Sequence, residues 1–516
     1  MTSIGCGGRK SDNPVTAETN GSDSTVAAVV VPTLEELTLP DTSFQSAEHI
    51  VYRVECQDSD NHELKYYDDL YQQSPNVMTF RRNLLRNADF GGRVSGTPSD
   101  IEIAWTFETA FDTTHTRFGQ WGGGTGWTGQ PLYMHWTDEE QSLLRQQVPT
   151  LTADFAEEEI MVGSLCGKAY FINFQTGQAS RQPLDLHNVV KGTMSKDPEL
   201  MNLYVGQGVP KGEPLGCQAF SLLTHQRLTF FNDTRAWRGW QAFDSSPIVA
   251  GGYLFWPGEN GSLFKFERTD EGLRLVTTLR YRVRGAAPGI ESSLCVYRNY
   301  GFFSDNHGNV LCVNLNTMRP VWHYDNHDDS DGTMVCRVEN NTPYLYTGCE
   351  VDKQGVHGTC HVIKLNGLTG EPVWDTPTAC HRVELPTKTL DGGMYASPLL
   401  GTGDCHDMLF ANICRNGASD SRGELTAFST ETGEVLWTVP YGVFAWSSPV
   451  AFLNEHDELF VFTGDANGYV YLVRGRTGEV LIKKMVGFNF ESSPCVVGNT
   501  AVVGARGRNI YKFVVR

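Results

Sequence analysis

The sequence predicts an all-β fold, an eight-bladed β-propeller of four-stranded blades, and three observations lead to it. A two-strand phrase with a Thr-Gly turn recurs along the chain, as in residues 423–437 (GELTAFSTETGEVLW) and 468–482 (GYVYLVRGRTGEVLI). A phrase of the Ser-Ser-Pro type stands ahead of the copies, at a period of about 40–60 residues that is typical of propeller blades. A further strand that matches the end of the first phrase lies apart from the others, around Trp105.

Each repeat is expected to supply four antiparallel strands. The Ser-Ser-Pro-type phrase leads into a short inner strand, for example at 450–452, and a second strand follows, for example at 459–463. The two-strand phrase then adds the third and fourth strands, in which apolar and polar residues alternate. The recurring tryptophans and glycines are expected to dock one blade on the next and to be structural: Trp322, Trp374, Trp437, Gly433 and Gly478.

The residue that leads each Ser-Ser-Pro-type phrase is expected to face one mouth of the central channel. These residues are Thr128, Lys191, Asp244, Glu291, Asp331, Tyr395, Trp446 and Glu491. Converging carboxylates can bind a cation and can perturb one another's pKa, which are marks of a functional site. In the alternative interpretation, each side chain only hydrogen-bonds the backbone of a neighbouring blade. The residue pattern leaves both interpretations open.

The last repeat lacks a fourth strand, and the missing strand is found before the first repeat. Residues 101–107 (IEIAWTF) match residues 434–439 (EVLWTV), with Trp105 in the place of Trp437. We therefore expect residues of about 101–109 to pair with the C-terminal blade and close the ring. Closure of this kind removes exposed sheet edges.

The repeat G-x-L-x-A-x-x-x-x-T-G-x-x-x-W, with its Ser-Ser-Pro phrase, resembles that of pyrroloquinoline-quinone (PQQ)-type β-propellers. That superfamily contains the quinoprotein alcohol dehydrogenases and the outer-membrane assembly lipoprotein BamB, to which this sequence is closest in type. The resemblance covers residues of about 100–516 and implies the propeller fold. It implies less about activity, because such a repeat encodes architecture.

Three regions are expected: a tether over residues 1–40, an extension over 41–100 that packs on the propeller, and the propeller over 101–516. Ser3-Ile4-Gly5-Cys6 resembles a bacterial lipobox, in which Cys6 would carry the lipid, and a polar stretch follows it. Only five residues precede Cys6, so either a signal peptide begins upstream or Cys6 is an ordinary cysteine of a polar tail. Within residues 79–98, Arg81, Arg82, Asn83 and Arg86 are expected to pack under the ring.

Two aromatic loops interrupt the repeat and are the other candidate ligand-binding segments. Trp121 and Trp127 lie among glycines in the first loop, and Trp237, Arg238 and Trp240 lie in the second. Indole rings with a flexible backbone can stack on sugars, quinones or peptide side chains. The alternative is that both loops are a packed cap that plugs the channel.

Composition and motifs exclude several other classes. A net charge of −19 argues against a nucleic-acid partner, which requires a basic surface. The 13 cysteines include no C-x-x-C pair, so a zinc ribbon and a haem-attachment motif are absent. The loop at 325–332 is not an EF-hand, because His327 and Val338 occupy positions that require acidic ligands. His381 and His406 lack the spacing of paired metal ligands.

We weigh three functions. The favoured one is a non-catalytic binding scaffold of the bacterial cell envelope, in the periplasm or outer membrane, anchored through Cys6 and holding an envelope protein or small ligand. The second is a carbohydrate-binding or carbohydrate-active surface protein, suggested by the tryptophan loops. The third is a PQQ-dependent dehydrogenase, although the sequence has no adjacent cysteine pair and no motif that fixes a catalytic Asp. No catalytic residue, metal ligand or cofactor is assigned, and PQQ and calcium lack support from motifs.

Overall fold

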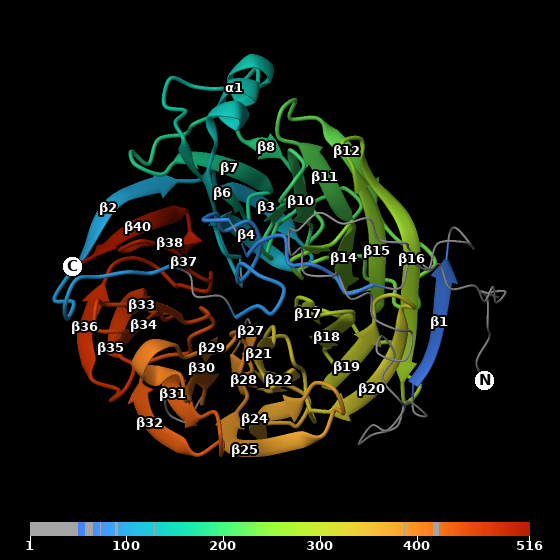
Figure 1. The fold of residues 1–516 in the computed structure, drawn as a ribbon, viewed down its shortest axis with the longest axis vertical. Coiled ribbons are helices and arrows are strands. Elements are labelled where there is room, and N and C mark those ends of the chain that lie inside the picture. Colours follow the sequence, from blue (N-terminus) through green and yellow to red (C-terminus); the bar gives the residue numbers. More distant parts are fainter. Residues whose placement is uncertain are drawn as a thin grey trace, which may run out of the picture.

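The structure is a computed structural model that describes residues 50–56, 65–72, 74–87, 91–127, 129–385, 388–415 and 423–516. These residues form ten β-sheets, of which eight contain four or more strands. Figure 1 shows the eight larger sheets around a common centre, each with one edge strand near the centre and the other at the rim. We number them sheet 1 to sheet 8 in chain order. The prediction of an all-β fold built from four-stranded antiparallel sheets is confirmed.

Four of these sheets are simple meanders in which each strand pairs with the next. Sheet 1 contains β5 (Leu132–His135), β6 (Glu158–Gly163), β7 (Lys168–Asn173) and β8 (Leu184–Asp185). Sheet 2 contains β9 (Ser195–Lys196), β10 (Asn202–Gly206), β11 (Cys217–Ser221) and β12 (Arg227–Phe231). Sheet 4 contains β17 (Cys295–Tyr297), β18 (Tyr300–Ser304), β19 (Asn309–Asn314) and β20 (Arg319–Asp325). Sheet 7 contains β33 (Val450–Leu453), β34 (Leu459–Gly464), β35 (Tyr469–Arg474) and β36 (Val480–Met485).

The other four sheets depart from this pattern by exchanging or adding strands. Sheet 3 contains β13 (Ile248–Ala250), β14 (Tyr253–Gly258), β15 (Ser262–Thr269) and β16 (Gly272–Val283), with β1 (Ile50–Cys56) added at its edge. Sheet 5 contains β21 (Val335–Glu339), β22 (Thr342–Gly348), β24 (His357–Asn366) and β25 (Pro372–His381). Sheet 6 contains β23 (Glu350–Val351), β28 (Gly392–Gly393), β29 (Leu399–Leu400), β30 (Met408–Cys414), β31 (Gly423–Ser429) and β32 (Val435–Pro440). Sheet 8 contains β37 (Cys495–Val497), β38 (Thr500–Gly504), β40 (Asn509–Val515) and β2 (Ile101–Glu108).

Two small sheets, one α-helix and the short 3-10 helix η2 (Gly403–Cys405) complete the described elements. One small sheet contains β3 (Asp112–Thr116), β4 (Gly119–Gly124) and β39 (Arg506–Gly507), and the other contains β26 (Val383–Leu385) and β27 (Lys388–Leu390). Helix α1 (Asp138–Gln147) begins with a capping box, in which Thr137 and Glu140 bond each other's backbone N–H. Sequence reasoning missed this helix, although the capping box was a readable signal. Among the described residues, no helix has the length and apolar content needed to cross a bilayer.

The recurring tryptophans and glycines hold neighbouring sheets together, which confirms their predicted structural role. Each tryptophan ring packs directly against a glycine of the next sheet, and a Cβ added to that glycine would lie only 2.7 Å from the ring. The pairs are Trp322–Gly370, Trp374–Gly433 and Trp437–Gly478. The three glycines have φ between 74° and 77°, a conformation that side chains disfavour. Each indole Nε1 donates to a backbone carbonyl of the same neighbour, those of Gly367, Thr430 and Gly475, at 3.0–3.1 Å. Glycine is therefore favoured at these positions for two reasons: it tolerates the positive φ of the turn, and it leaves room for the tryptophan ring.

β2 repeats this arrangement between sheet 8 and sheet 1. It pairs antiparallel with β40, from Ile101 opposite Val515 to Glu108 opposite Asn509. Trp105 Nε1 donates to the Phe174 carbonyl at 2.9 Å, and a Cβ on Gly177 would lie 2.6 Å from the Trp105 ring. The pairing skips one residue just before Trp105, and β20, β25 and β32 skip the residue before their own tryptophan in the same way. β2 therefore occupies the position of an outermost strand.

The segment before β2 lies against the inner ends of several sheets. Arg81 and Arg86 are 1% and 0% exposed. Arg81 Nη2 donates to the Ser397 carbonyl at 2.7 Å, ahead of sheet 6. Arg86 donates to the Leu294 carbonyl at 2.9 Å, ahead of sheet 4, and to the Ser246 carbonyl at 3.2 Å, ahead of sheet 3. Buried guanidinium groups thus find backbone acceptors on three sheets.

Candidate functional site

The Ser-Ser-Pro-type phrases form a belt of hydrogen bonds close to the centre. In this belt a backbone N–H of one phrase donates to a hydroxyl of the next phrase along the chain. The pairs, with the donor first, are Gln130–Thr193, Ser246–Ser293, Ser293–Thr333, Ser397–Ser448 and Ser448–Ser493. The Ser492 hydroxyl donates to the Gly129 carbonyl and so links sheet 8 to sheet 1. The small residues are therefore structural, and the residue ahead of them is left for other contacts. One of those leading residues, Thr128, lies outside the described residues.

Lys191 lies among three acidic side chains. Its ammonium forms an ion pair with Asp244 and lies 3.8 Å from Glu291 Oε2. One carboxylate oxygen each of Asp244, Glu291 and Glu259 lies within 4.8 Å of the other two. The ammonium also lies 4.8 Å from the centre of the Trp127 ring, a cation–π distance. The predicted residues Lys191, Asp244, Glu291 and Trp127 are thus brought together.

A second acidic group adjoins the first. One carboxylate oxygen each of Asp329, Asp331 and Glu350 lies within 4.8 Å of the other two. Lys353 Nζ lies 3.3 Å from Asp329 Oδ2 and is the nearest ion-pair partner of this group. Glu350 reaches it because β23 leaves the path of sheet 5 and pairs with β28 in sheet 6.

Five carboxyls of the two groups hold their protons more tightly than ordinary carboxyl groups, those of Glu259, Glu291, Asp329, Asp331 and Glu350. Burial is the main cause of their raised pKa values, and repulsion from neighbouring carboxylates raises these values further. Burial and Asp244 raise the pKa of Glu291 to about 7, although Lys191 opposes them. Burial raises the pKa of Asp329 to about 6, against the influence of Lys353.

The remaining buried carboxyls behave in the same way. Burial and the neighbouring carboxylates raise the pKa values of Glu259, Asp331 and Glu350 well above the usual range. Glu291 contributes to the increase at all three, so the two acidic groups act on each other. The two acidic groups therefore lie near too few positive charges for all their carboxyls to ionise together.

Three carboxylate oxygens of the second group have no hydrogen-bond partner among the described residues: Asp329 Oδ1, Asp331 Oδ1 and Glu350 Oε1. Glu350 is 3% exposed, and its Oε1 finds no partner among the described residues. Asp305 and Asp465 also follow the second strand of a sheet, but they accept hydrogen bonds from Tyr281 and Tyr471 and from nearby backbone N–H groups. These aspartates are satisfied within their own structural surroundings, whereas Glu350 can still accept a hydrogen bond from a ligand.

The aromatic and acidic residues on the other side of the centre form two smaller contacts. Tyr395 and Trp446 are stacked with ring centres 4.8 Å apart, and a hydrogen bond from Tyr395 lowers the pKa of Glu350, against the larger effect of burial. Glu491 pairs with Arg506 at 2.8 Å, and the Arg506 guanidinium lies 5.1 Å from the centre of the Trp121 ring. These predicted residues are therefore held by each other and by Arg506.

The second aromatic loop divides between the mouth and the outside. Arg238 lies close enough to Glu291 to lower the pKa of that carboxyl. Trp240 is half-buried and contacts Phe118 edge to face at 5.1 Å. The Trp237 ring lies 4.8 Å from the guanidinium of Arg282 on β16, the long strand of sheet 3. Of the three predicted residues, Arg238 is the one that acts on the acidic groups.

Sequence reasoning did not find Glu259, Asp329 or Glu350. Asp329 lies two residues ahead of the leading residue Asp331, and Glu259 and Glu350 come just after the second strands of their sheets. A signal was present for Glu259, because it shares the turn position of Asp305 and Asp465. No local pattern indicates Glu350, because its place depends on the exchange of β23 between sheets.

Comparison with known proteins agrees with the sequence interpretation of the repeat. Residues 421–515 match the family model described as "Outer membrane protein assembly factor BamB". The predicted PQQ-like, BamB-like character of the propeller repeat is thus confirmed. No curated protein matches the chain.

Solved structures show the same fold at low sequence identity. The quinohemoprotein alcohol dehydrogenase ADHIIG from Pseudomonas putida HK5 is 13% identical, with a TM-score of 0.56, and the match covers 86% of this chain and 81% of that one. The quinohemoprotein alcohol dehydrogenase from Comamonas testosteroni is 12% identical, with a TM-score of 0.55 and the same coverage. BamB from Moraxella catarrhalis is 14% identical over 72% of this chain and 97% of that one, with a TM-score of 0.48.

Proposed function

We propose that this chain is a non-catalytic binding scaffold of the bacterial cell envelope, an eight-bladed propeller that holds a protein partner at its central mouth. The match of residues 421–515 to an outer membrane protein assembly factor supports the scaffold role and the envelope location. The eight larger sheets are the proposed blades. The pairing of β2 with β40 and the Trp105 contact with Gly177 support closure of the ring between blades 8 and 1.

The partner group at the mouth is proposed to be cationic, such as a Lys or Arg side chain of an envelope protein. The observation that carries this proposal is the set of three neighbouring buried oxygens without a hydrogen-bond partner among the described residues, Asp329 Oδ1, Asp331 Oδ1 and Glu350 Oε1. An arriving ammonium or guanidinium group would donate hydrogen bonds to these oxygens and displace the protons that they retain. Tyr395 and Trp446 offer an aromatic face beside the same group.

An arginine-rich peptide is expected to bind the wild-type protein at least about tenfold more tightly than an Asp331→Asn/Glu350→Gln double variant. The variant removes two acceptor charges and keeps the shape of both side chains. It is also expected to melt at a higher temperature than the wild type, because it relieves repulsion among buried carboxyls. Fluorescence anisotropy of the labelled peptide and a thermal melt measure the two effects.

The matched control is Glu431→Gln/Glu434→Gln, which removes two exposed carboxylates from the turn before β32. This variant is expected to bind the peptide as the wild type does. Equal affinity of the mouth variant and the wild type would show that peptide binding is not at the mouth, and the proposal would fail.

A PQQ-dependent dehydrogenase is supported less well by the residues present. Calcium at the carboxylates of Asp244, Glu259 and Glu291 would meet the Lys191 ammonium, which already lies among them. A second cation there would be repelled by Lys191 at short range. The first acidic group thus does not fit calcium, and the proposed role requires no cofactor.

Attachment to the membrane through a lipidated Cys6 is also part of the proposal. Cys6 lies outside the described residues, so its support comes from the sequence Ser3-Ile4-Gly5-Cys6. A Cys6→Ser variant that fractionates with the membranes as the wild type does would exclude this anchor.

A further inference from the structure

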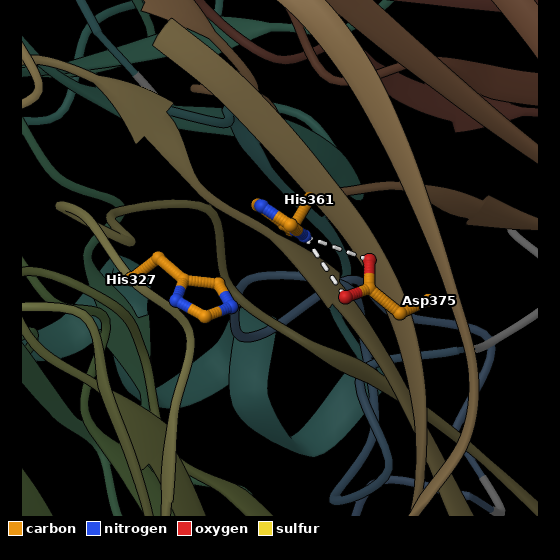
Figure 2. Close-up of side chains that lie close together, drawn as sticks. All are labelled: His327, His361 and Asp375. Atoms are coloured by element: carbon orange, nitrogen blue, oxygen red, sulfur yellow. Dashed lines mark hydrogen bonds and ion pairs between the residues drawn. The ribbon is translucent and has the colours of Figure 1, made fainter.

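A group of two histidines and one aspartate lies away from the central mouth, where sheet 4 meets sheet 5. His327 lies in the turn after β20, His361 lies in β24, and Asp375 lies in β25. One ligand atom of each residue lies within 4.8 Å of the other two. Figure 2 shows His361 between the other two, with Asp375 on one side and His327 on the other. The three elements therefore converge on one small volume.

The geometry within the group is close. His361 Nδ1 lies 2.9 Å from both carboxylate oxygens of Asp375. The rings of His327 and His361 lie 4.3 Å apart between centres and are inclined by 45°. The side chains of His361 and Asp375 are 19% and 32% exposed, so an ion can reach them from solvent.

Backbone structure holds all three residues in place. Ile363 pairs with Asp375 across β24 and β25, and His361 lies two residues from Ile363, so its side chain points to the same face. His327 has a φ of 71°, and its N–H donates to Asp325 Oδ1 at 3.0 Å. Asp325 is paired in turn with Arg284 at 2.6 Å. The group is thus organised by strand register and by a braced turn.

We propose that His327, His361 and Asp375 bind a divalent transition-metal ion, for which Zn²⁺ is the natural probe. Imidazole nitrogens suit zinc and its neighbours, whereas Ca²⁺ and Mg²⁺ take oxygen ligands. Three protein ligands are common where zinc keeps a fourth position for water or for a donor from another molecule. Asp375 can serve either as a direct ligand or as the acceptor that orients His361.

The bound ion would tie sheet 4 to sheet 5. His327 belongs to the connection that leaves sheet 4, while both other donors belong to the outer strands of sheet 5. Trp322 also joins these two sheets, because its Nε1 donates a hydrogen bond to the Gly367 carbonyl. Metal binding should therefore stabilise the folded chain, because the unfolded chain cannot keep these donors together.

The test is titration of the chelator-treated full chain with Zn²⁺ by calorimetry, together with the visible absorption of bound Co²⁺. The wild type is expected to bind Zn²⁺ and to melt at a higher temperature in its presence. His327→Asn and His361→Gln are each expected to weaken binding by more than about tenfold and to lose the Co²⁺ spectrum. Asn suits position 327, because it tolerates a positive φ.

His187→Asn is the matched control. His187 is an exposed histidine whose Nδ1 lies 3.5 Å from Asp185, and the described residues place neither of them in a three-donor group. This variant is expected to bind Zn²⁺ within about twofold of the wild type. The proposal is overturned if the wild type binds no Zn²⁺, or if His327→Asn binds it as tightly as the wild type.

Discussion

Replacing Trp105 by Ala is expected to lower the free energy of unfolding by about 3–5 kcal/mol, the usual cost of removing a buried tryptophan. Trp105 is 8% exposed, fills the space over Gly177 and donates to the Phe174 carbonyl. Its loss would weaken the contact between sheet 8 and sheet 1 and leave that carbonyl without its indole donor. Equilibrium unfolding in guanidinium chloride, followed by circular dichroism, measures the change.

Phe488→Ala is the control, because Phe488 is 68% exposed and its loss should cost less than about 1 kcal/mol. Deletion of residues 101–108 is the stronger form of the experiment and is expected to abolish the single cooperative transition. A deleted chain with the wild-type midpoint would show that β2 does not hold sheet 8 to sheet 1.

Raising the pH from 5 to 8 is expected to destabilise the wild type relative to a Glu291→Gln/Asp329→Asn variant by roughly 3–5 kcal/mol. The folded-state pKa values of these carboxyls are raised to about 7 and about 6, mainly by burial. The folded protein therefore binds more protons than the unfolded chain in this range, and stability falls as the pH rises. Urea unfolding of both proteins at several pH values measures the difference.

The test uses the difference between the unfolding free energies of the wild type and the variant at each pH, because other groups also change the pH dependence of each protein. Burial lowers the pKa of His225 to about 4, so this residue favours the folded state as the pH rises and opposes the effect of the carboxyls. That contribution is common to both proteins and cancels. Parallel pH dependences would contradict the assignment of Glu291 and Asp329 as carboxyls with raised pKa values.

The repeat allowed much of the fold to be predicted. The Thr-Gly turn and the tryptophan lie on consecutive strands, so their spacing is local and readable, and the match of Trp105 to Trp437 indicated the position of β2. The addition of β1 to sheet 3 and the exchange of β23 between sheets were not predicted. Both depend on pairing between segments that share no sequence pattern.

The candidate site was predictable where its residues follow the repeat. Asp244, Glu291 and Asp331 each lead a Ser-Ser-Pro-type phrase, and the structure brings each into an acidic group. Glu350 could not be found in this way, because strand exchange determines its place. The three residues proposed to bind zinc lie on three elements without any motif spacing, and only the folded structure brings them together.

β2 also determines the order in which the molecule can assemble during translation. Sheets 1, 2, 4 and 7 each take their strands from one continuous stretch, so they can form as the chain emerges. Ile101, however, pairs with Val515, so β2 must wait unpaired while the strands of seven other sheets are synthesised. A waiting strand can also pair with β40 of another molecule, which would produce domain-swapped oligomers at high protein concentration. The pairing of β2 with β40 is therefore also the point at which two unfinished molecules can exchange strands.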